Sequence, residues 1–296
     1  MMMPADSLTT QVPRNRAFEC CPLGCKTELQ KSAITLAEGP LLRCPTCTQL
    51  LSSCTREQYE LALNKWDTAC GTQPESRSAS RFRHVARRRL GHALRLLGPR
   101  QSPPRLLDVG CSSGSLLAVA ADLGFSVVGV EIASNAAQTA QHKGFEVFPG
   151  SLHEAHFPDK SFDVITLIEL IEHVRDPLVL LSECRRILKQ DGIIVINTPN
   201  ADSWTARFMR EGWDGFSLTA MGGHISFFSP SSIRLLARAS GFVVAHLETR
   251  NVRFYEKGQC HPIIYRLGKI MQEFLALPTR FAGRGHDLLV FLQPVK

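Results

Sequence analysis

Two glycines and two carboxylates, spaced along residues 106–131, give this chain its clearest chemical signal. Asp108 and Gly110 follow two leucines, and Gly114 comes four residues after Gly110. Glu131 ends a second apolar stretch. This order is typical of a buried strand, a glycine turn, a helix and a second strand, whose carboxyl ends border the ligand in nucleotide-binding folds. Glu131 stands 21 residues after Gly110, where an acidic side chain can accept hydrogen bonds from ribose hydroxyls.

The carboxylate of Asp108 narrows the class of ligand. It would repel the pyrophosphate that dinucleotide folds place at this turn, whereas it suits a ligand that carries an ammonium and a sulfonium. The run from Asp108 to Gly114 resembles the first motif of the class I S-adenosylmethionine-dependent methyltransferases, D/E-x-G-x-G-x-G, with Ser112 in place of the middle glycine. The resemblance covers residues 104–250. The alternative is a tight turn that binds no ligand.

The resemblance implies an α/β fold with a doubly wound, mostly parallel seven-stranded sheet, and S-adenosylmethionine as the cofactor. In such a fold Ile132 is the apolar platform for the adenine ring. Ser151 occupies the position where the family often has an Asp that reads the adenine amino group. The cofactor-binding residues implied are Asp108, Gly110, Cys111, Gly114, Glu131, Ile132, Ser151, Leu167 and Glu169.

A second motif runs from Phe162 to Val174 and contains Glu172-His173-Val174, followed by Asp176-Pro177. It is similar to the fourth motif of the ubiquinone-biosynthesis type of methyltransferase. In that family the end of this strand faces the transferable methyl, so Glu172 and His173 are expected near the reacting centre. His173 is therefore a candidate catalytic residue. The alternative is that the segment only orders the loop.

Residues 198–228 form the candidate substrate region. Thirty-odd residues between a strand and a helix is long for a compact domain, and such insertions are often lids or binding loops. The segment is rich in aromatic residues and glycines, and His224 is its only histidine. His224 is the first candidate for removing a proton from the acceptor. The alternatives are a small satellite core for the segment and a structural role for the histidine.

Cysteines near the start of the chain predict a metal site. Cys21 and Cys25 are followed, after 18 residues, by Cys44 and Cys47. This spacing nearly matches the C-x2-C-x15–20-C-x2-C pattern of a zinc ribbon, in which four thiolates surround structural Zn²⁺. The first pair has one residue too many, and Cys20 could replace Cys21. The alternative is a reduced cysteine-rich loop without metal.

The rest of the chain supplies the elements that position these residues. Strands and helices alternate after residue 100, which predicts a parallel sheet with helices on both faces. Helices are expected at 56–68, at 81–97, from Ser134 to Gly144, from Asp176-Pro177 and from Ser229-Pro230 to Gly241. In the methyltransferase family the last two strands form an antiparallel hairpin. The strands expected are 105–109, 126–131, 145–148, 163–168, 191–197, 242–249 and 287–293.

Composition divides the chain into four parts: a disordered tail (1–17), the zinc-ribbon-like module (18–55), a helical linker region (56–100) and the methyltransferase domain (101–296).

The net charge is +7, and nine arginines without any Asp or Glu lie between Arg77 and Arg105. We expect them to form a solvated face rather than a nucleic-acid site, because aromatic stacking residues are nearly absent there. No apolar run suits a signal peptide or a membrane span, so we expect a cytoplasmic protein with reduced or metal-bound cysteines.

The sequence therefore predicts an S-adenosylmethionine-dependent methyltransferase that acts on a small-molecule acceptor, with O-methylation as the first interpretation. The zinc module resembles one found ahead of deoxysugar C-methyltransferases, which keeps a carbohydrate C-methyltransferase as an alternative. The sequence is also compatible with a nucleic-acid methyltransferase and with a non-enzymatic zinc-dependent interaction protein. The oligomeric state is left open.

Overall fold

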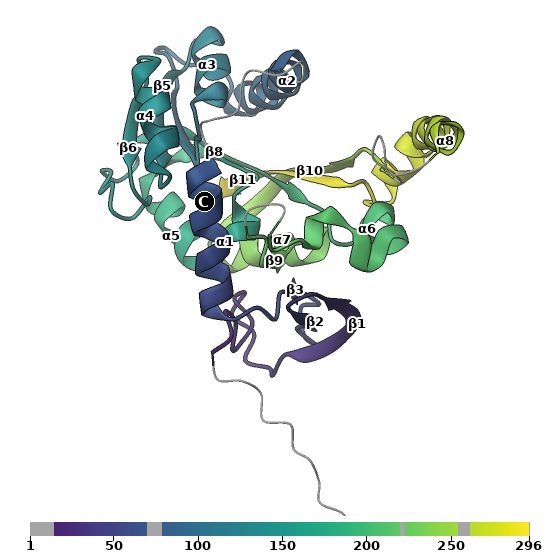
Figure 1. Cartoon of the computed structure of the whole chain (residues 1–296). Coiled ribbons are helices and arrows are strands. Elements are labelled where there is room, and N and C mark those ends of the chain that lie inside the picture. Colours follow the sequence, from purple (N-terminus) through teal and green to yellow (C-terminus); the bar gives the residue numbers. More distant parts are fainter. Residues whose placement is uncertain (1–14, 70–78, 220–222, 254–260, 296) are drawn as a thin grey trace, which may run out of the picture.

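The computed structural model describes residues 15–69, 79–219, 223–253 and 261–295 (Figure 1). Its centre is a seven-stranded sheet in the order β10-β11-β8-β7-β4-β5-β6. Neighbouring strands from β6 to β8 are parallel, whereas β11 is antiparallel to both β8 and β10. The strands are β4 (Arg105–Val109), β5 (Ser126–Glu131), β6 (Glu146–Pro149), β7 (Phe162–Ile168), β8 (Leu188–Pro199), β10 (Phe242–Arg250) and β11 (Asp287–Pro294). The predicted fold class and the terminal hairpin are confirmed.

Helices cover both faces of this sheet because neighbouring residues on a strand point to opposite sides. Leu106 packs with α2 (Ala79–Leu97), α3 (Ser115–Asp122) and α4 (Ser134–His142) on one face. On the other face Leu107 belongs to a cluster that includes residues of α5 and α7. Those two helices span Pro177–Ile187 and Pro230–Ala239. The result is a three-layer α/β/α arrangement (Figure 1).

Helices α5 and α7 begin at the start signals read from the sequence, whereas α4 has Ala133 at its N-cap and Ser134 is its first helical residue. Helix α5 begins at Pro177, directly after Asp176. Helix α7 has a capping box, in which the Ser229 hydroxyl accepts from the backbone N–H of Ser232 and the Ser232 hydroxyl accepts from that of Ser229. Strand β8 begins at Leu188, three residues before the expected start, because Leu188 already pairs with Phe162 of β7.

The N-terminal region packs against the larger domain, and its small sheet includes a strand from that domain. Strands β1 (Gln30–Leu36), β2 (Gly39–Arg43) and β3 (Leu50–Leu51) are joined by β9 (Ser226–Phe227). The fourth strand thus comes from the candidate substrate region. Helix α1 (Arg56–Ala69) follows β3. Residues 1–14 of the expected tail and 70–78 of the expected linker lie outside the described residues. Arg16, which was also expected in the tail, pairs with Thr55.

The segment between β8 and α7 is folded into short helices: α6 (Trp204–Met209), η2 (Arg210–Gly212) and η3 (Asp214–Phe216), with η1 (Ile171–His173) beneath it. Trp213, Phe216 and Phe227 are buried in one cluster with Leu41 of β2. These three aromatic residues therefore form a satellite core, which was the alternative to a lid, whereas Phe208 is exposed and Phe228 belongs to the main core. Residues 220–222 lie outside the described part.

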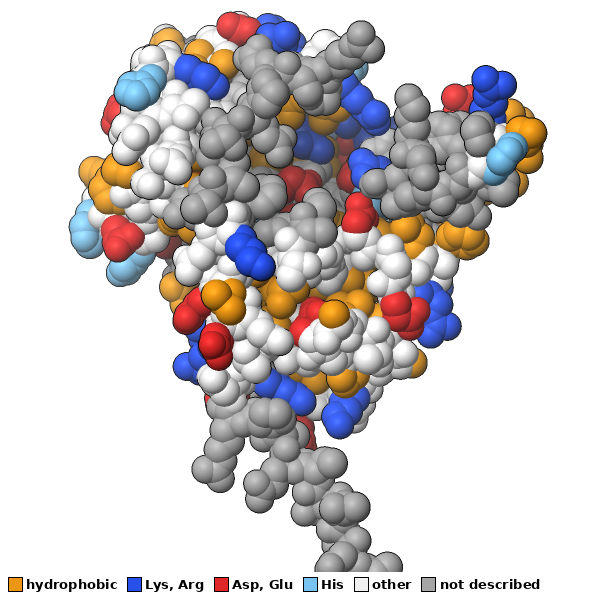
Figure 2. Space-filling view, viewed as in Figure 1, with side chains coloured by type: hydrophobic (Ala, Val, Ile, Leu, Met, Phe, Trp, Pro, Cys, Tyr) orange, Lys and Arg blue, Asp and Glu red, His pale blue; other side chains and the backbone are white. Residues whose placement is uncertain are grey.

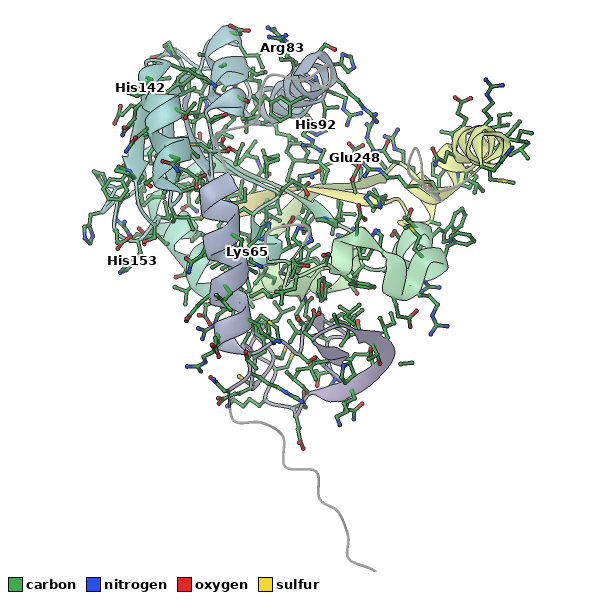
Figure 3. All side chains as sticks on the ribbon, viewed as in Figure 1. Lys65, Arg83, His92, His142, His153 and Glu248 are labelled. Atoms are coloured by element: carbon green, nitrogen blue, oxygen red, sulfur yellow. The ribbon has the colours of Figure 1, made fainter. Side chains whose placement is uncertain are left out.

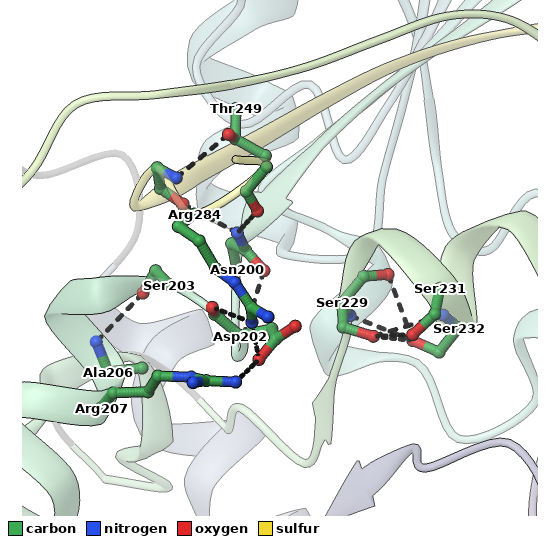
Figure 4. Close-up of polar contacts among 12 residues, drawn as sticks. Asn200, Asp202, Ser203, Ala206, Arg207, Ser229, Ser231, Ser232, Thr249 and Arg284 are labelled. Atoms are coloured by element: carbon green, nitrogen blue, oxygen red, sulfur yellow. Dashed lines mark hydrogen bonds and ion pairs between the residues drawn. The ribbon is translucent and has the colours of Figure 1, made fainter. Parts of the chain in front are cut away.

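Polar contacts tie this segment to the β10–β11 hairpin (Figure 4). The Asn200 side-chain amide donates to the carbonyl oxygen of Gly285 at 2.8 Å. Asp202 accepts from Arg207 at 2.8 Å and pairs with Arg284. Ser203 caps α6 by accepting from the Ala206 N–H. These bonds fix the chain that leads into the His224 region.

One helix was not foreseen from the sequence. Helix α8 (Pro262–Phe281) lies between β10 and β11 and stands off the edge of the sheet (Figure 1). Within the described residues, none of the helices is long and apolar enough to cross a membrane.

Candidate functional site

Asp108 stands at the carboxyl end of β4 and is buried. The Thr166 hydroxyl, on the neighbouring strand β7, donates to its Oδ1 at 2.6 Å. Burial raises the pKa of the Asp108 carboxyl to about 7, against the lowering effect of the Thr166 bond, and the nearby Glu131 raises it further. A cation next to Asp108 would reverse this shift, which fits a ligand that brings an ammonium.

The glycine turn after β4 has the backbone that its sequence predicts. Gly110 and Gly114 have φ values of +76° and +82°, in the left-handed region that favours glycine. Ser112, which replaces the middle glycine of the motif, also has a positive φ, of +47°. A Cβ on Gly114 would lie 2.9 Å from the Phe145 ring, so this glycine is needed for packing as well as for the turn.

Glu131, at the end of β5, faces the turn. Its carboxylate accepts from the backbone N–H groups of Ser112 and Ala133, both at 2.8 Å. An ionised carboxylate has about four acceptor positions, so it can also accept from ribose hydroxyls. The next residue, Ile132, leaves 63% of its surface exposed although it is apolar. Ser151 is engaged by its own loop, because its hydroxyl and N–H both donate to Glu154.

Of the other three predicted cofactor-binding residues, Cys111 and Leu167 lie deeper, whereas the Glu169 side chain is exposed. Cys111 and Leu167 are buried side chains of the two core clusters, so only their backbone borders the turn and the end of β7. Glu169 follows β7 with a φ of +51° and bonds to Asn197. Desolvation of its carboxyl and the charge of Asp287 raise its pKa to about 7, while Arg89 lowers it. Glu169 thus belongs to a polar network with Asn197 and Arg89.

The structure brings both candidate catalytic histidines together with Glu172. The His173 and His224 rings are 4.7 Å apart between centroids and nearly perpendicular. His224 Nε2 lies 3.9 Å from Glu172 Oε1. Glu172 and His224 are almost fully buried, and the Ile225 N–H donates to the Glu172 carbonyl. Tyr59 of α1 donates to the His173 carbonyl at 2.7 Å, a contact across 114 residues that no local sequence pattern could indicate.

The hydrogen bonds define which nitrogen of His224 can accept a proton. Its Nδ1 lies 3.0 Å from the Gly215 carbonyl, which can only accept, so Nδ1 carries the hydrogen and Nε2 has the free lone pair. Burial lowers the pKa of His224, which favours the neutral ring. Burial and the neighbouring Glu169 hold the pKa of Glu172 well above its usual range.

Both carboxyl oxygens of Glu172 are buried without a hydrogen-bond partner among the described residues. Ligand atoms of Glu172, His173 and His224 lie within 4.8 Å of one another, a spacing that a metal ion could also use. The arrangement can therefore take up a proton or a cation at one place, beyond the carboxyl end of β7.

Comparison with known proteins identifies the family. A family model described as a methyltransferase domain matches residues 82–247, which is more than half of the chain. The chain belongs to the methyltransferase domain family.

Relatives of this methyltransferase include the ubiquinone biosynthesis O-methyltransferase of Cereibacter sphaeroides, which is 30% identical over 154 residues. That match covers 46% of this chain and 59% of the relative, so the chain spans little more than half the length of the curated relative. A probable S-adenosylmethionine-dependent methyltransferase of Mycolicibacterium smegmatis is 33% identical over 97 residues, covering 32% of this chain and 38% of the relative.

Solved structures share the methyltransferase fold. One is the complex between the Haloferax volcanii Trm112 methyltransferase activator and a putative methyltransferase, with a TM-score of 0.53 and 18% identity over 81% of this chain and 98% of the other. Another is a possible histamine N-methyltransferase of Thermotoga maritima, with a TM-score of 0.52 and 20% identity over 80% and 98% of the two chains. At these identities the likeness shows the fold alone.

The methyltransferase also carries a group of four cysteines. The sulfur atoms of Cys21, Cys25, Cys44 and Cys47 lie within 4.8 Å of one another, and those of Cys21 and Cys47 are 3.4 Å apart. Tetrahedral Zn²⁺ with bonds of about 2.3 Å places its sulfurs about 3.8 Å apart, which this group fits. Cys20 is exposed and outside the group.

The electrostatics of the cysteine group favour at least one thiolate. Burial opposes ionisation of Cys44, but hydrogen bonds from the Cys47 backbone and the Thr27 hydroxyl lower its pKa to about 6. Burial raises the pKa of Cys47 to about 11, which is the expected behaviour of crowded thiols without a cation. Cys21, Cys44 and Cys47 pack in the same core cluster as β7 and α7.

The arginine-rich helix α2 is solvated on one side only. Figure 3 shows Arg83 on the outer side of α2 and His92 on the side of the sheet, where its ring lies 4.5 Å from that of Phe291. Arg89 donates to the Asn197 side-chain oxygen at 2.7 Å. Arg89 thus faces Asn197 and Glu169 rather than open solvent, and burial lowers the pKa of its guanidinium. Figure 2 shows a recess on this face of the molecule in which basic and acidic side chains are both visible. That the exposed arginines form a solvated face rather than a nucleic-acid site stays a prediction.

Proposed function

We propose that this methyltransferase transfers the methyl group of S-adenosylmethionine to an oxygen of a small-molecule acceptor. The observation that carries the proposal is the meeting of Glu172, His173 and His224 just beyond β7. Strand β7 pairs in parallel with β4, which bears Asp108, so their carboxyl ends share one edge of the sheet. Ligands of open α/β sheets bind at that edge. The O-methyltransferase activity in the names of several relatives supports oxygen as the acceptor atom.

The residues of the first motif fit the cofactor. Glu131 would accept from the ribose hydroxyls, Ile132 would support the adenine ring, and Asp108 would face the ammonium. Ser151 would contact the adenine edge only if its hydroxyl gave up its hydrogen bond to Glu154 in the same loop. S-adenosylmethionine supplies an electrophilic methyl on a sulfonium, which is a good leaving group. The protein therefore has to align the acceptor and, for a hydroxyl, to remove its proton.

His224 is the residue that we assign to proton removal. Its Nδ1–H is held by the Gly215 carbonyl, which leaves Nε2 ready to accept. Glu172 Oε1 lies 3.9 Å from the same Nε2, at the place where the acceptor's proton would arrive. His173, packed edge-on against His224, is the second candidate.

The test is methyl transfer by the purified full-length chain from labelled S-adenosylmethionine to panels of hydroxyl, amine and sugar acceptors. We expect label in hydroxyl-bearing products, with the methyl carbon shifted to the O-methyl range in NMR spectra. Transfer to amines alone would overturn the oxygen assignment. Failure to bind S-adenosylmethionine at all would favour a non-enzymatic interaction protein.

A carbohydrate C-methyltransferase is the second candidate function. The four-cysteine group ahead of the methyltransferase fold favours it, because that arrangement resembles the one in deoxysugar enzymes. The same NMR experiment separates the two, since a C-methyl product would show a new carbon–carbon bond at the sugar ring.

A further inference from the structure

Helix α8 presents an apolar face to the outside of the molecule. Seven large apolar side chains of this helix are more than half exposed, among them Phe274 at 76% and Phe281 at 86%. They recur at intervals of three and four residues and so follow one side of the helix. The seven residues are Ile263, Leu267, Ile270, Met271, Phe274, Leu277 and Phe281.

The opposite side of α8 holds the helix to the sheet edge. Thr279 is fully buried, and its carbonyl accepts from the Thr249 hydroxyl of β10. Arg280 lies 3.6 Å from Glu248, which also makes two bonds to Arg250. The apolar stripe points away from these anchors, because Thr279 is about half a turn around the helix from Phe274. Isolated apolar residues are ordinary on a protein surface, whereas a continuous stripe marks an interaction site.

The charges of α8 indicate what covers the stripe. The helix carries three basic residues, Arg266, Lys269 and Arg280, against the single acid Glu273. Arg266, Glu273 and Arg280 follow each other at seven-residue intervals and therefore lie along one flank of the stripe. In an antiparallel pair of α8 helices, Arg266 of one copy would face Arg280 of the other and Glu273 would face its own copy. Like charges would meet at each of these positions.

We propose that α8 binds the surface of an anionic lipid bilayer, with its apolar stripe buried at the boundary between headgroups and acyl chains. A 20-residue helix with an apolar face rich in Phe, Leu and Ile and a net positive charge has the features of an interfacial helix. The net positive charge of the helix complements the headgroup phosphates of an anionic bilayer, whereas in the antiparallel pair described above like charges would meet. The inference does not depend on the methyl acceptor, because it concerns a surface remote from the first motif.

The test is co-flotation of the full-length chain with vesicles of phosphatidylcholine and with vesicles that contain phosphatidylglycerol. We expect binding to the anionic vesicles that weakens as salt is added, since surface charge attraction is screened. The double variant Leu267→Gln/Phe274→Gln should reduce the bound fraction by at least about tenfold. Arg266→Glu should also reduce it on anionic vesicles.

Matched controls lie elsewhere on the surface. Val179→Gln removes an apolar side chain that is 64% exposed on α5, and Arg238→Glu reverses an exposed charge on α7. Both should bind vesicles as the wild type does, and all variants should keep the wild-type melting temperature. Equal binding to neutral and anionic vesicles would overturn the proposal. So would the absence of vesicle binding together with a dimer in analytical ultracentrifugation that Leu267→Gln/Phe274→Gln dissociates.

Discussion

Asp108 and Glu131, the two carboxylates beside the glycine turn, have different hydrogen-bond partners. These partners decide which of the two residues can be replaced with least disturbance of the core. Asp108 is buried, and its carboxyl accepts from the Thr166 hydroxyl, so its replacement would change hydrogen bonding in the core as well as ligand binding. Glu131 is also buried, and its two oxygens accept from two backbone N–H groups of the turn. Replacement by Gln keeps one of the two oxygen acceptors and places an NH2 donor against the other backbone N–H, whereas Ala removes both acceptors. The stability of the turn therefore has to be measured beside ligand binding in the Glu131 variants.

Glu131→Ala should weaken S-adenosylmethionine binding by roughly 1.5–3 kcal/mol, the usual contribution of hydrogen bonds to a charged acceptor. Isothermal titration calorimetry gives the affinity directly, and thermal unfolding reports whether the turn survives. Glu146→Ala removes an exposed carboxylate from the nearby strand β6 and should leave the affinity unchanged. An unaltered affinity in Glu131→Ala would remove this residue from the site.

His224→Ala should lower kcat by roughly 10²–10⁴-fold for a hydroxyl acceptor, with S-adenosylmethionine affinity nearly intact, because it removes the proton acceptor. The neutral ring is the active form, so the wild-type rate should fall as pH drops through the His224 pKa. Burial lowers that pKa, which places the loss of activity below the usual histidine range. The variant should lack this limb of the pH profile.

Measuring activity with and without a chelator distinguishes the two possible roles of His224, proton acceptor and metal ligand. Activity that is insensitive to chelation but dependent on His224 supports a proton acceptor. Activity lost on chelation while elemental analysis shows the cysteine-bound zinc retained, and restored by a divalent ion, would instead make Glu172, His173 and His224 metal ligands. Normal turnover and an unchanged pH profile in His224→Ala would return the residue to a structural role.

At the scale of elements, the sequence predicts the strands and helices that local patterns define. It does not predict the elements and contacts that form between segments distant in the sequence. The apolar runs at β4 and β5 and the Pro at the start of α5 are local signals, and the elements begin where they predict. Strand β9 has two residues, and only its pairing with Leu50 and Leu51 makes it a strand. Helix α8 was missed because its stripe faces outward, so nothing in a core-based interpretation required it. The meeting of Glu172 with His224 likewise depends on the 51 residues between them folding back.

Gly114→Ala tests how the turn supports both α3 and α4. A Cβ there would meet Phe145 at 2.9 Å and Ala140 at 3.2 Å, in a backbone with positive φ. Gly124→Ala is the matched control, since its φ is +87° but nothing lies within 4 Å of the added Cβ. Backbone strain alone costs roughly 1–3 kcal/mol. Gly114→Ala should add about 1–3 kcal/mol for overpacking. Urea unfolding measures the free energy of unfolding of both variants. Equal losses of stability in Gly114→Ala and Gly124→Ala would show that the Phe145 ring moves aside without cost.

At the scale of the whole molecule, the cysteine group is part of the methyltransferase body. Cys21, Leu23, Cys44 and Cys47 share a core cluster with residues of β7, α5 and α7. The sheet of the N-terminal region takes its fourth strand from the segment that carries His224. A metal bound by the cysteines would therefore stabilise the catalytic segment as well as the small module. Metal removal should then affect unfolding of the entire chain.

We expect one zinc per chain in protein purified without added metal, bound by Cys21, Cys25, Cys44 and Cys47. Cys21→Ser should lose that zinc and lower the melting temperature of the single unfolding transition, because the ligands are shared with the core and binding energy becomes folding energy. Cys20→Ser changes the adjacent, exposed cysteine outside the group and should keep both zinc and stability. Elemental analysis with calorimetric melting checks both variants. Two separate transitions, with only the smaller one sensitive to Cys21→Ser, would show instead that the module folds independently of the methyltransferase.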